Sequence, residues 1–188
     1  MEVLDAIKNR YSCRSFTGEK VDIENLMVLA QCGFHAPSGM NKQPWKIIVL
    51  NKKEVLDEMD DYVMNQLKNQ EDKSSYNRMM DRGGKVYYNA SSAIIIAIEE
   101  GKQLDCGIVA ENIALAATSL GLGNCICGML RVALENKEYH DLLIPEGYVF
   151  GTSILLGHTD TTPTPHEIDH DKINYIGDEE FNAYFVKW

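Results

Sequence analysis

The spacing of apolar residues predicts three amphipathic helices in the N-terminal part of the chain. Val3, Leu4 and Ile7 lie at helical intervals, and a second helix is expected after Asp22, a residue type that favours the N-cap position. Residues 53–68 show the same periodicity, with apolar positions spaced among charged ones. Each of these helices therefore has one face that can pack against a core.

Three short apolar runs predict β-strands. They are WKIIVL at 45–50, SAIIIAI at 92–98 and VFGTSILLG at 149–157. The second run is rich in β-branched residues and uninterrupted by polar ones, which is typical of a buried central strand. NCICGM at 124–129 is interpreted as a further short strand or a loop.

Further helices are expected between and after these strands. An Ala-rich helix is expected to begin with Asp105 as its cap and to stop at Gly121. Its small side chains allow close packing, either in the core or against another subunit. A modest helix is expected near 132–142, and the polar stretch 69–85 is interpreted as a surface loop with a possible short helix over 76–80.

Composition limits the classes of partner. The chain has 188 residues, of which 45% are hydrophobic and 24% charged, as in an ordinary globular domain. A net charge of −10 disfavours binding to nucleic acid or to an anionic membrane, because both would be repelled. No apolar run is long enough to span a bilayer, and no signal peptide is recognised, so a cytoplasmic protein that binds small molecules is expected.

The cysteines and histidines give little support to a metal site. Five cysteines, odd in number and scattered, favour reduced thiols over a disulfide framework. Cys125 and Cys127 form a C-x-C pair, and residues 158–171 are rich in His and acidic side chains. Neither stretch has the spacing of a regular zinc site, so no metal is expected.

The chain is expected to form one domain and a tail. Residues 1–157 make the domain, and residues 158–188 make a C-terminal arm whose aromatic end is costly to expose to water. From composition alone, the arm can fold back on its own core or reach a second subunit.

A candidate anion site lies in RYSCR at 10–14. In extended backbone, Arg10, Ser12 and Arg14 share one face, so two guanidinium groups and a hydroxyl converge on one ligand. This combination suits a phosphate or a delocalised anion. Two surface arginines after a helix are the simpler interpretation of this motif when it is taken alone.

A rigid polar turn is predicted in HAPSGMNKQPW at 35–45. Pro37 fixes φ, Gly39 permits a positive φ, and Asn41 offers a donor and an acceptor, so the turn can present polar groups in a fixed geometry. Trp45 leads into a strand and is expected to anchor the turn in the core.

Together, these stretches resemble the FMN-dependent nitroreductase family. The matching pieces are RYSCR at 10–14, APSGMNKQPW at 36–45, DCGIVAENIALAATSLGLG at 105–123, ICGM at 126–129 and ILLGH at 154–158. The resemblance implies an α+β sandwich with a central, mostly antiparallel sheet flanked by helices. It also implies a homodimer in which the C-terminal arm packs on the partner subunit and FMN binds at the interface.

The resemblance further implies which residues contact the cofactor. Arg10 and Ser12 hold the FMN phosphate, and Arg14 approaches the pyrimidine edge of the isoalloxazine. The 35–45 turn comes from the other subunit, and the backbone near Gly128 faces flavin N5 without a role for the neighbouring thiol. No catalytic side chain is expected. The predicted cofactor-binding set is Arg10, Tyr11, Ser12, Arg14, Pro37, Ser38, Gly39, Asn41, Cys127 and Gly128.

The activity that the resemblance implies is that of an FMN-dependent NAD(P)H oxidoreductase. NAD(P)H delivers hydride to flavin N5 and leaves, and an electron-poor acceptor such as a nitroaromatic or a quinone then takes its place, in a ping-pong cycle. A cation such as Arg14 stabilises the negative charge of the reduced flavin.

One departure from the family pattern concerns the phosphate site. Many members carry Arg or Lys shortly after the final LG, whereas this chain has the acid-rich HTDTTPTPHEIDHDK at 158–172. His166, Lys172 or Lys85 are the candidate replacements. A flavin-binding or sensing module of the same fold without efficient turnover is therefore the alternative function.

Overall fold

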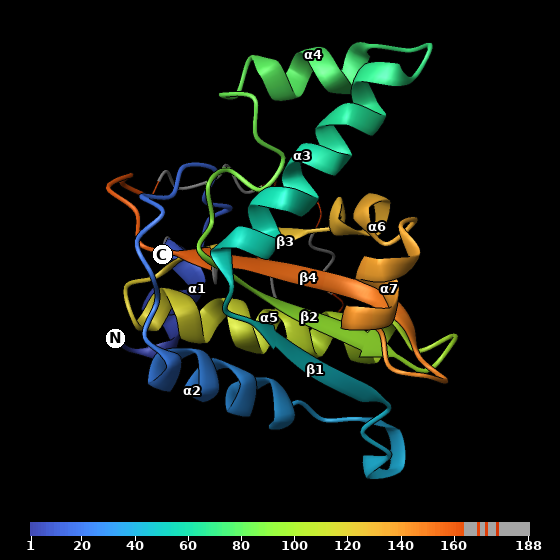
Figure 1. Cartoon of the computed structure of the whole chain (residues 1–188). Coiled ribbons are helices and arrows are strands. Elements are labelled where there is room, and N and C mark those ends of the chain that lie inside the picture. The colour runs from blue at the N-terminus through green and yellow to red at the C-terminus, as the bar shows by residue number, and fades with distance from the viewer. Residues whose placement is uncertain (164–168, 170–171, 173–175, 177–188) are drawn as a thin grey trace.

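Four β-strands form one antiparallel sheet in a computed structural model that describes residues 1–163, 169, 172 and 176. The order of strands across the sheet is β1-β2-β4-β3 (Figure 1). Their bounds are Trp45–Leu50 for β1, Ser92–Ile98 for β2, Gly123–Cys127 for β3 and Val149–Gly157 for β4. The predicted α+β class and antiparallel sheet are confirmed, and NCICGM contributes a strand.

The apolar side chains of β2 pack into two hydrophobic cores, one on each face of the sheet. β2 lies between β1 and β4, and all seven of its residues are buried. Because side chains of a strand alternate between faces, Ile95 packs into the core on one side of the sheet, while Ile94 and Ile96 pack into the core on the other.

Helices cover both faces of the sheet (Figure 1). One layer consists of α1 (Val3–Asn9), α2 (Ile23–Phe34) and α5 (Gln103–Ser119), and the other of α3 (Lys53–Asn69), α6 (Leu130–Ala133) and α7 (Lys137–Leu143). α4 (Ser74–Met80) continues from α3 and confirms the short helix predicted within the polar loop. The sheet thus lies between two helical layers, each closing its own core.

Two helix boundaries differ from the sequence prediction. α5 begins at Gln103 with Lys102 as its N-cap, so the prediction of Asp105 as the cap was wrong. Asp105 lies in the first turn, where a negative charge favours the positive end of the helix dipole. The single helix expected near 132–142 is two helices, because Asn136 interrupts it and caps α7 by accepting the Glu138 N–H at 2.9 Å.

Two further sequence predictions concern membrane-spanning helices and the C-terminal arm. Within the described part of the chain, no helix is long and apolar enough to cross a membrane. Most of the predicted C-terminal arm, 158–188, lies outside the described residues. The division into a domain and an arm therefore stays a prediction.

Candidate functional site

The RYSCR segment leaves α1 as extended chain beside the edge strand β3. Ser12 forms an isolated parallel bridge with Asn124, and the Cys13 N–H donates to the Asn124 carbonyl oxygen at 2.8 Å. Cys13 is fully buried, whereas Ser12 is partly exposed and Arg14 is exposed. The segment is therefore extended, as the alternating motif predicted.

The polar side chains of this motif act electrostatically on Cys125 of β3. Burial raises the pKa of the Cys125 thiol, while the charges of Arg14 and Arg10 and a hydrogen bond with Ser12 act in the opposite direction. Arg10 also pairs with Glu111 on α5, with 3.9 Å between Nε and Oε1. Arg10, Ser12 and Arg14 are called the arginine patch below.

Tyr11 points away from this patch and holds the chain that follows β4. Its hydroxyl lies 2.7 Å from Thr161 Oγ1 and 3.1 Å from the Thr161 carbonyl oxygen, and its ring packs against the core. Burial raises the pKa of Tyr11, and the hydrogen bond with Thr161 opposes this shift. Its place in the cofactor-binding set stays a prediction.

The segment after β4 lies along the chain that follows RYSCR. Thr159 Oγ1 donates to the Ser15 carbonyl oxygen at 2.7 Å, and the Thr17 N–H donates to the His158 carbonyl oxygen at 2.9 Å. At the place where the family pattern puts a cation, the described part of this chain therefore presents hydroxyl groups.

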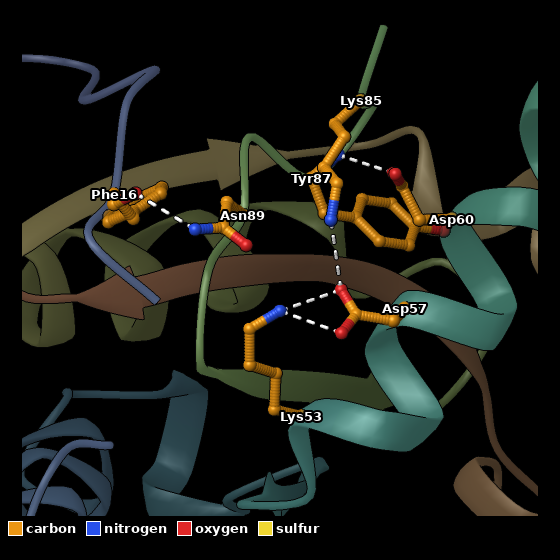
Figure 2. Close-up of polar contacts among 7 residues, drawn as sticks. All are labelled: Phe16, Lys53, Asp57, Asp60, Lys85, Tyr87 and Asn89. Atoms are coloured by element: carbon orange, nitrogen blue, oxygen red, sulfur yellow. Dashed lines mark hydrogen bonds and ion pairs between the residues drawn. The ribbon is translucent and has the colours of Figure 1, made fainter. Parts of the chain in front are cut away.

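Lys85 and Lys172, two of the suggested replacement cations, pair with carboxylates. Lys85 Nζ lies 3.3 Å from Asp57 Oδ1, and Lys53 Nζ lies 2.7 Å from the same carboxylate (Figure 2). Burial alone would raise the pKa of Asp57, but hydrogen bonds and charges from the two lysines lower it. Lys172 Nζ lies 3.9 Å from Asp169 Oδ2, and His166 lies outside the described residues.

Asp60 is a buried anchor that the sequence reasoning missed. It is 3% exposed and accepts the Tyr87 N–H at 2.8 Å, which holds the segment leading into β2 (Figure 2). Burial raises the pKa of Asp60, although the amide hydrogen bonds from Tyr87 and Val86 act against the shift. Its helical spacing from Leu56 and Val63, both buried, was the available signal.

Cys127 ends β3 and begins the turn into α6. Burial raises the pKa of its thiol to about 11, and hydrogen bonds from the backbone N–H groups of Met129 and Leu130 oppose the shift. Its carbonyl oxygen accepts a hydrogen bond from Ser153 Oγ at 2.6 Å. A buried thiol that stays protonated at neutral pH is structural and not a nucleophile.

At three glycines, neither a backbone angle nor a close contact within the described residues requires the absence of a side chain. A Cβ added at Gly39, Gly107 or Gly128 would meet no atom within 4 Å, and none of the three has a positive φ. Gly107 lies inside α5, where glycine costs about 1 kcal/mol relative to alanine. Each of these positions has open space beside its backbone, which allows close approach of a ligand or of a second chain.

The turn before β1 is braced by its own polar side chains. The Gln43 N–H donates to Ser38 Oγ at 2.9 Å, and Gln43 Nε2 donates to Asn41 Oδ1 at 3.2 Å. Gly39 was expected to permit a positive φ, but the positive φ angles of this turn fall on Met40 (55°), Asn41 (53°) and Gln43 (48°). Left-handed backbone at non-glycine residues is unfavourable and concentrates at binding sites.

The two halves of the predicted site lie apart within one chain. Trp45 is 4% exposed, which confirms its role as the anchor of the turn, while Pro37 and Asn41 are exposed. Figure 1 shows the turn between the C-terminal end of α2 and the start of β1, and the chain that follows α1 on the opposite side of the view. The first residue of the turn, His35, lines a hollow with Val3 and Ala6 of α1. The tip of the turn lies apart from the chain that carries Arg10 and Arg14.

Comparison with known proteins identifies the family. Residues 7–152 match the model described as the nitroreductase family. The chain belongs to the nitroreductase family. A crystal structure of a nitroreductase with bound FMN from Desulfitobacterium hafniense DCB-2 is 44% identical, with a TM-score of 0.88, and the match covers 94% of this chain and 100% of that one. A nitroreductase with bound FMN from Bacteroides fragilis NCTC 9343 is 25% identical, with a TM-score of 0.80 over 94% of this chain and 100% of that one.

The name of a curated relative includes NADH and NAD(P)H. It is the "Putative NADH dehydrogenase/NAD(P)H nitroreductase" of Archaeoglobus fulgidus, which is 28% identical over 182 residues. The match covers 92% of this chain and 94% of the relative. The nitroreductase-family fold therefore extends over nearly the full length of both proteins.

This nitroreductase-family chain exposes apolar side chains over the layer of α1, α2 and α5. A hollow of about 380 Å³ between these helices is lined in part by Val3, Cys32 and Leu115. The exposed large apolar residues of this layer are Val3, Leu4, Ile7, Ile23, Met27, Val28, Phe34, Leu104 and Leu120. Many exposed apolar residues on one helical layer are typical of an interface.

Metal-ligand geometry is absent from residues 1–163 and the three isolated described positions. No group of three or more His, Cys, Asp or Glu side chains there is arranged to hold a metal ion. Most of the His- and acid-rich stretch that raised the question lies outside the described residues.

Proposed function

We propose that this chain is an FMN-dependent NAD(P)H oxidoreductase that reduces electron-poor small molecules such as nitroaromatics or quinones. The observation that carries the proposal is the extended segment with Arg10, Ser12 and Arg14 that pairs with Asn124 of β3, the strand that ends one residue before the open Gly128 position. The FMN bound by the Desulfitobacterium hafniense nitroreductase, at 44% identity, supports the same cofactor here. Bound FMN supplies the redox chemistry, taking a hydride from NAD(P)H and passing it to the acceptor.

The residues of the chain bind and orient the cofactor. Arg10 and Ser12 hold the phosphate, because a guanidinium group stays charged and donates two parallel hydrogen bonds to an oxyanion. Arg14 favours negative charge on the flavin ring system, which supports reduction. The backbone at Gly128 meets the ring edge, and the protonated Cys127 thiol takes no part in the chemistry.

Two chains form each site in this proposal. The braced turn of one chain lies far from its own arginine patch, so a second copy supplies the turn that closes over the flavin. The exposed apolar layer of α1, α2 and α5 is the surface where the copies meet. Gly107 on α5 permits close approach of a helix there. The C-terminal arm extends over the second copy.

A flavin-binding or sensing module without efficient turnover is the second candidate. The hydroxyl groups of Thr159 and Thr161 stand where many family members carry a cation, and Lys85 pairs with Asp57. A phosphate site with one cation fewer binds FMN more weakly, which suits a module that responds to flavin concentration.

Anaerobic spectroscopy of the purified protein separates these candidates. The oxidoreductase binds FMN, its flavin absorbance is bleached by NADH or NADPH, and a nitroaromatic or a quinone restores it. Flavin that binds but is reduced by neither nicotinamide supports the sensing module. Protein that cannot be loaded with FMN contradicts both proposals.

A further inference from the structure

Ser153 of β4 makes a buried hydrogen bond at the end of β3. Ser153 is fully buried and pairs with Cys127 in the register of the two strands. Its hydroxyl donates to the Cys127 carbonyl oxygen at 2.6 Å, which is short for an O–H···O bond. A buried hydroxyl is costly without a partner, so this bond fixes the Ser153 side chain in place.

The bond controls a second atom through the geometry of the peptide group. The Cys127 carbonyl and the Gly128 N–H belong to one planar trans peptide, so the two groups point in opposite directions. When Ser153 holds the oxygen toward the sheet, the Gly128 N–H points away from it. Gly128 is exposed, and this N–H has no hydrogen-bond acceptor among the described residues.

A backbone hydrogen bond holds the other side of Gly128. The Gly128 carbonyl oxygen accepts the Arg131 N–H at 3.2 Å, at the start of α6. The carbonyl groups on both sides of the Gly128 N–H are therefore hydrogen-bonded, which limits rotation of the Gly128 peptide. A hydrogen bond to the carbonyl also polarises the peptide and makes its N–H a better donor.

We propose that Ser153 is a positioning residue that aims and strengthens the Gly128 N–H as a hydrogen-bond donor to flavin N5. This rests on the proposed function, in which FMN lies against Gly128. In oxidised flavin N5 is an acceptor, whereas in reduced flavin it carries a proton. The Ser153-supported N–H therefore stabilises oxidised FMN more than reduced FMN, and so helps to set the potential at which the cofactor works.

Ser153→Ala tests this proposal, and Ser92→Ala is its matched control. Ser92 is also a fully buried serine of the sheet, but its hydroxyl donates to Asn51 Oδ1 at 2.9 Å, away from the end of β3. The measurements are the Kd of oxidised and of reduced FMN and the midpoint potential of the bound flavin. Ser153→Cys keeps a side-chain hydrogen-bond donor, although a weaker one, and serves as the second variant.

We expect Ser153→Ala to weaken the binding of oxidised FMN more than the binding of reduced FMN. The Kd of oxidised FMN rises about threefold in Ser153→Ala, corresponding to a fraction of one hydrogen bond. The Kd of reduced FMN rises less, so the midpoint potential moves upward. Ser153→Cys gives an intermediate shift, and Ser92→Ala gives none. A potential unchanged from the wild type, with both Kd values unchanged or both raised equally, overturns the proposal, because a purely structural serine affects both redox states alike.

One readout needs no flavin. In the FMN-free protein, the amide resonance of Gly128 is expected to move upfield in Ser153→Ala, because its peptide loses polarisation, and to stay unchanged in Ser92→Ala. An unmoved Gly128 resonance overturns the positioning role even if the protein never binds FMN. Failure of the wild type to bind FMN instead contradicts the proposed function, while the amide resonance still tests the effect of Ser153 on the Gly128 peptide.

Discussion

The two helical layers that cover the sheet differ in how far their apolar side chains are buried. On α3, Leu56 and Val63 are at most 1% exposed, and the outer side of the helix carries charges. On α1, the same kind of spacing leaves Val3 68% and Leu4 57% exposed. Apolar periodicity thus identifies the face of a helix that needs a partner, but it does not say whether that partner is the chain's own core or a second chain.

The first prediction tests this difference with two exposed leucines. Leu104 of α5 is 79% exposed and Leu142 of α7 is 59% exposed, so neither is needed to fold the single chain. We expect Leu104→Glu to convert a dimer into a monomer that no longer retains FMN, because a charge at an apolar interface must be desolvated. Leu142→Glu is expected to leave mass and flavin content unchanged. Light scattering with absorbance detection measures both quantities.

A parallel substitution at Gly107 sharpens the same test. A Cβ atom at Gly107 meets no atom of its own chain within 4 Å, and glutamate has a higher helix propensity than glycine, so the isolated chain of Gly107→Glu is expected to stay folded. It is nevertheless expected to dissociate the dimer. A stable dimer in both Leu104→Glu and Gly107→Glu would show that the α1, α2 and α5 layer is not the interface.

The second prediction concerns the arginine patch, which follows α1 in the layer of α1, α2 and α5. Arg14→Ala is expected to weaken FMN binding about tenfold or more, since a hydrogen bond to a charged group contributes about 1.5–3 kcal/mol. Arg78→Ala on α4 is the control, because it removes an exposed arginine whose guanidinium group donates to Ser75 Oγ of the same helix at 3.2 Å. Equal affinities for FMN in the two variants, measured by fluorescence titration, would contradict the assignment of Arg14.

The third prediction contrasts the carboxylates of Asp60 and Asp57, which both lie on α3. Burial raises the pKa of Asp60, so the folded state binds its proton more tightly than the unfolded state does. The contribution of Asp60 to stability therefore falls as pH rises from its unfolded pKa, about 3.9, through its folded pKa, and is constant above that. The stability difference between wild type and Asp60→Asn, measured by urea unfolding, is expected to decline over this window.

Asp57→Asn is the control for that pH series. Hydrogen bonds and charges from Lys53 and Lys85 lower the pKa of Asp57 despite its partial burial, so its contribution is present above the unfolded pKa and is lost as pH falls. The two aspartates are therefore expected to give slopes of opposite sign, with the smaller one at the half-exposed Asp57. Slopes of the same sign would refute the buried-anchor role of Asp60.

The fourth prediction has the smallest effect on function. Cys127→Ala removes a buried thiol whose pKa is about 11, so turnover is expected to stay within about twofold of the wild type. Stability is expected to fall by about 1 kcal/mol because the buried side chain loses its sulfur atom and leaves a small cavity. Loss of turnover with flavin still bound and the fold intact would show that the thiol itself takes part in the reaction.

The sequence allowed most of the fold to be predicted because the relevant signals are local. The uninterrupted apolar run of β2 and the periodicity of α3 depend only on near neighbours, and both elements were located correctly. The start of α5 was misplaced because Asp105 satisfies the rule for a cap, while Lys102 at the true cap makes no side-chain cap bond that a sequence pattern would reveal.

The site was predictable only in part, for a physical reason. The alternation of RYSCR is a local property and is seen in the extended chain beside Asn124. Contacts between distant segments carry no local signal: nothing in the sequence pairs Ser153 with the Cys127 carbonyl, or Tyr11 with Thr161. Gly39 was the residue of the turn expected to permit a positive φ, whereas Met40, Asn41 and Gln43 adopt it in a turn braced by hydrogen bonds from Gln43.

The most direct test of the account is the molar mass and flavin content of the protein in one experiment. Size-exclusion chromatography with light scattering and absorbance detection, after loading with FMN, is expected to give one species at twice the chain mass of 21.2 kDa with one FMN per chain. A species with the mass of a single chain that still retains FMN would contradict the claim that two chains build each site.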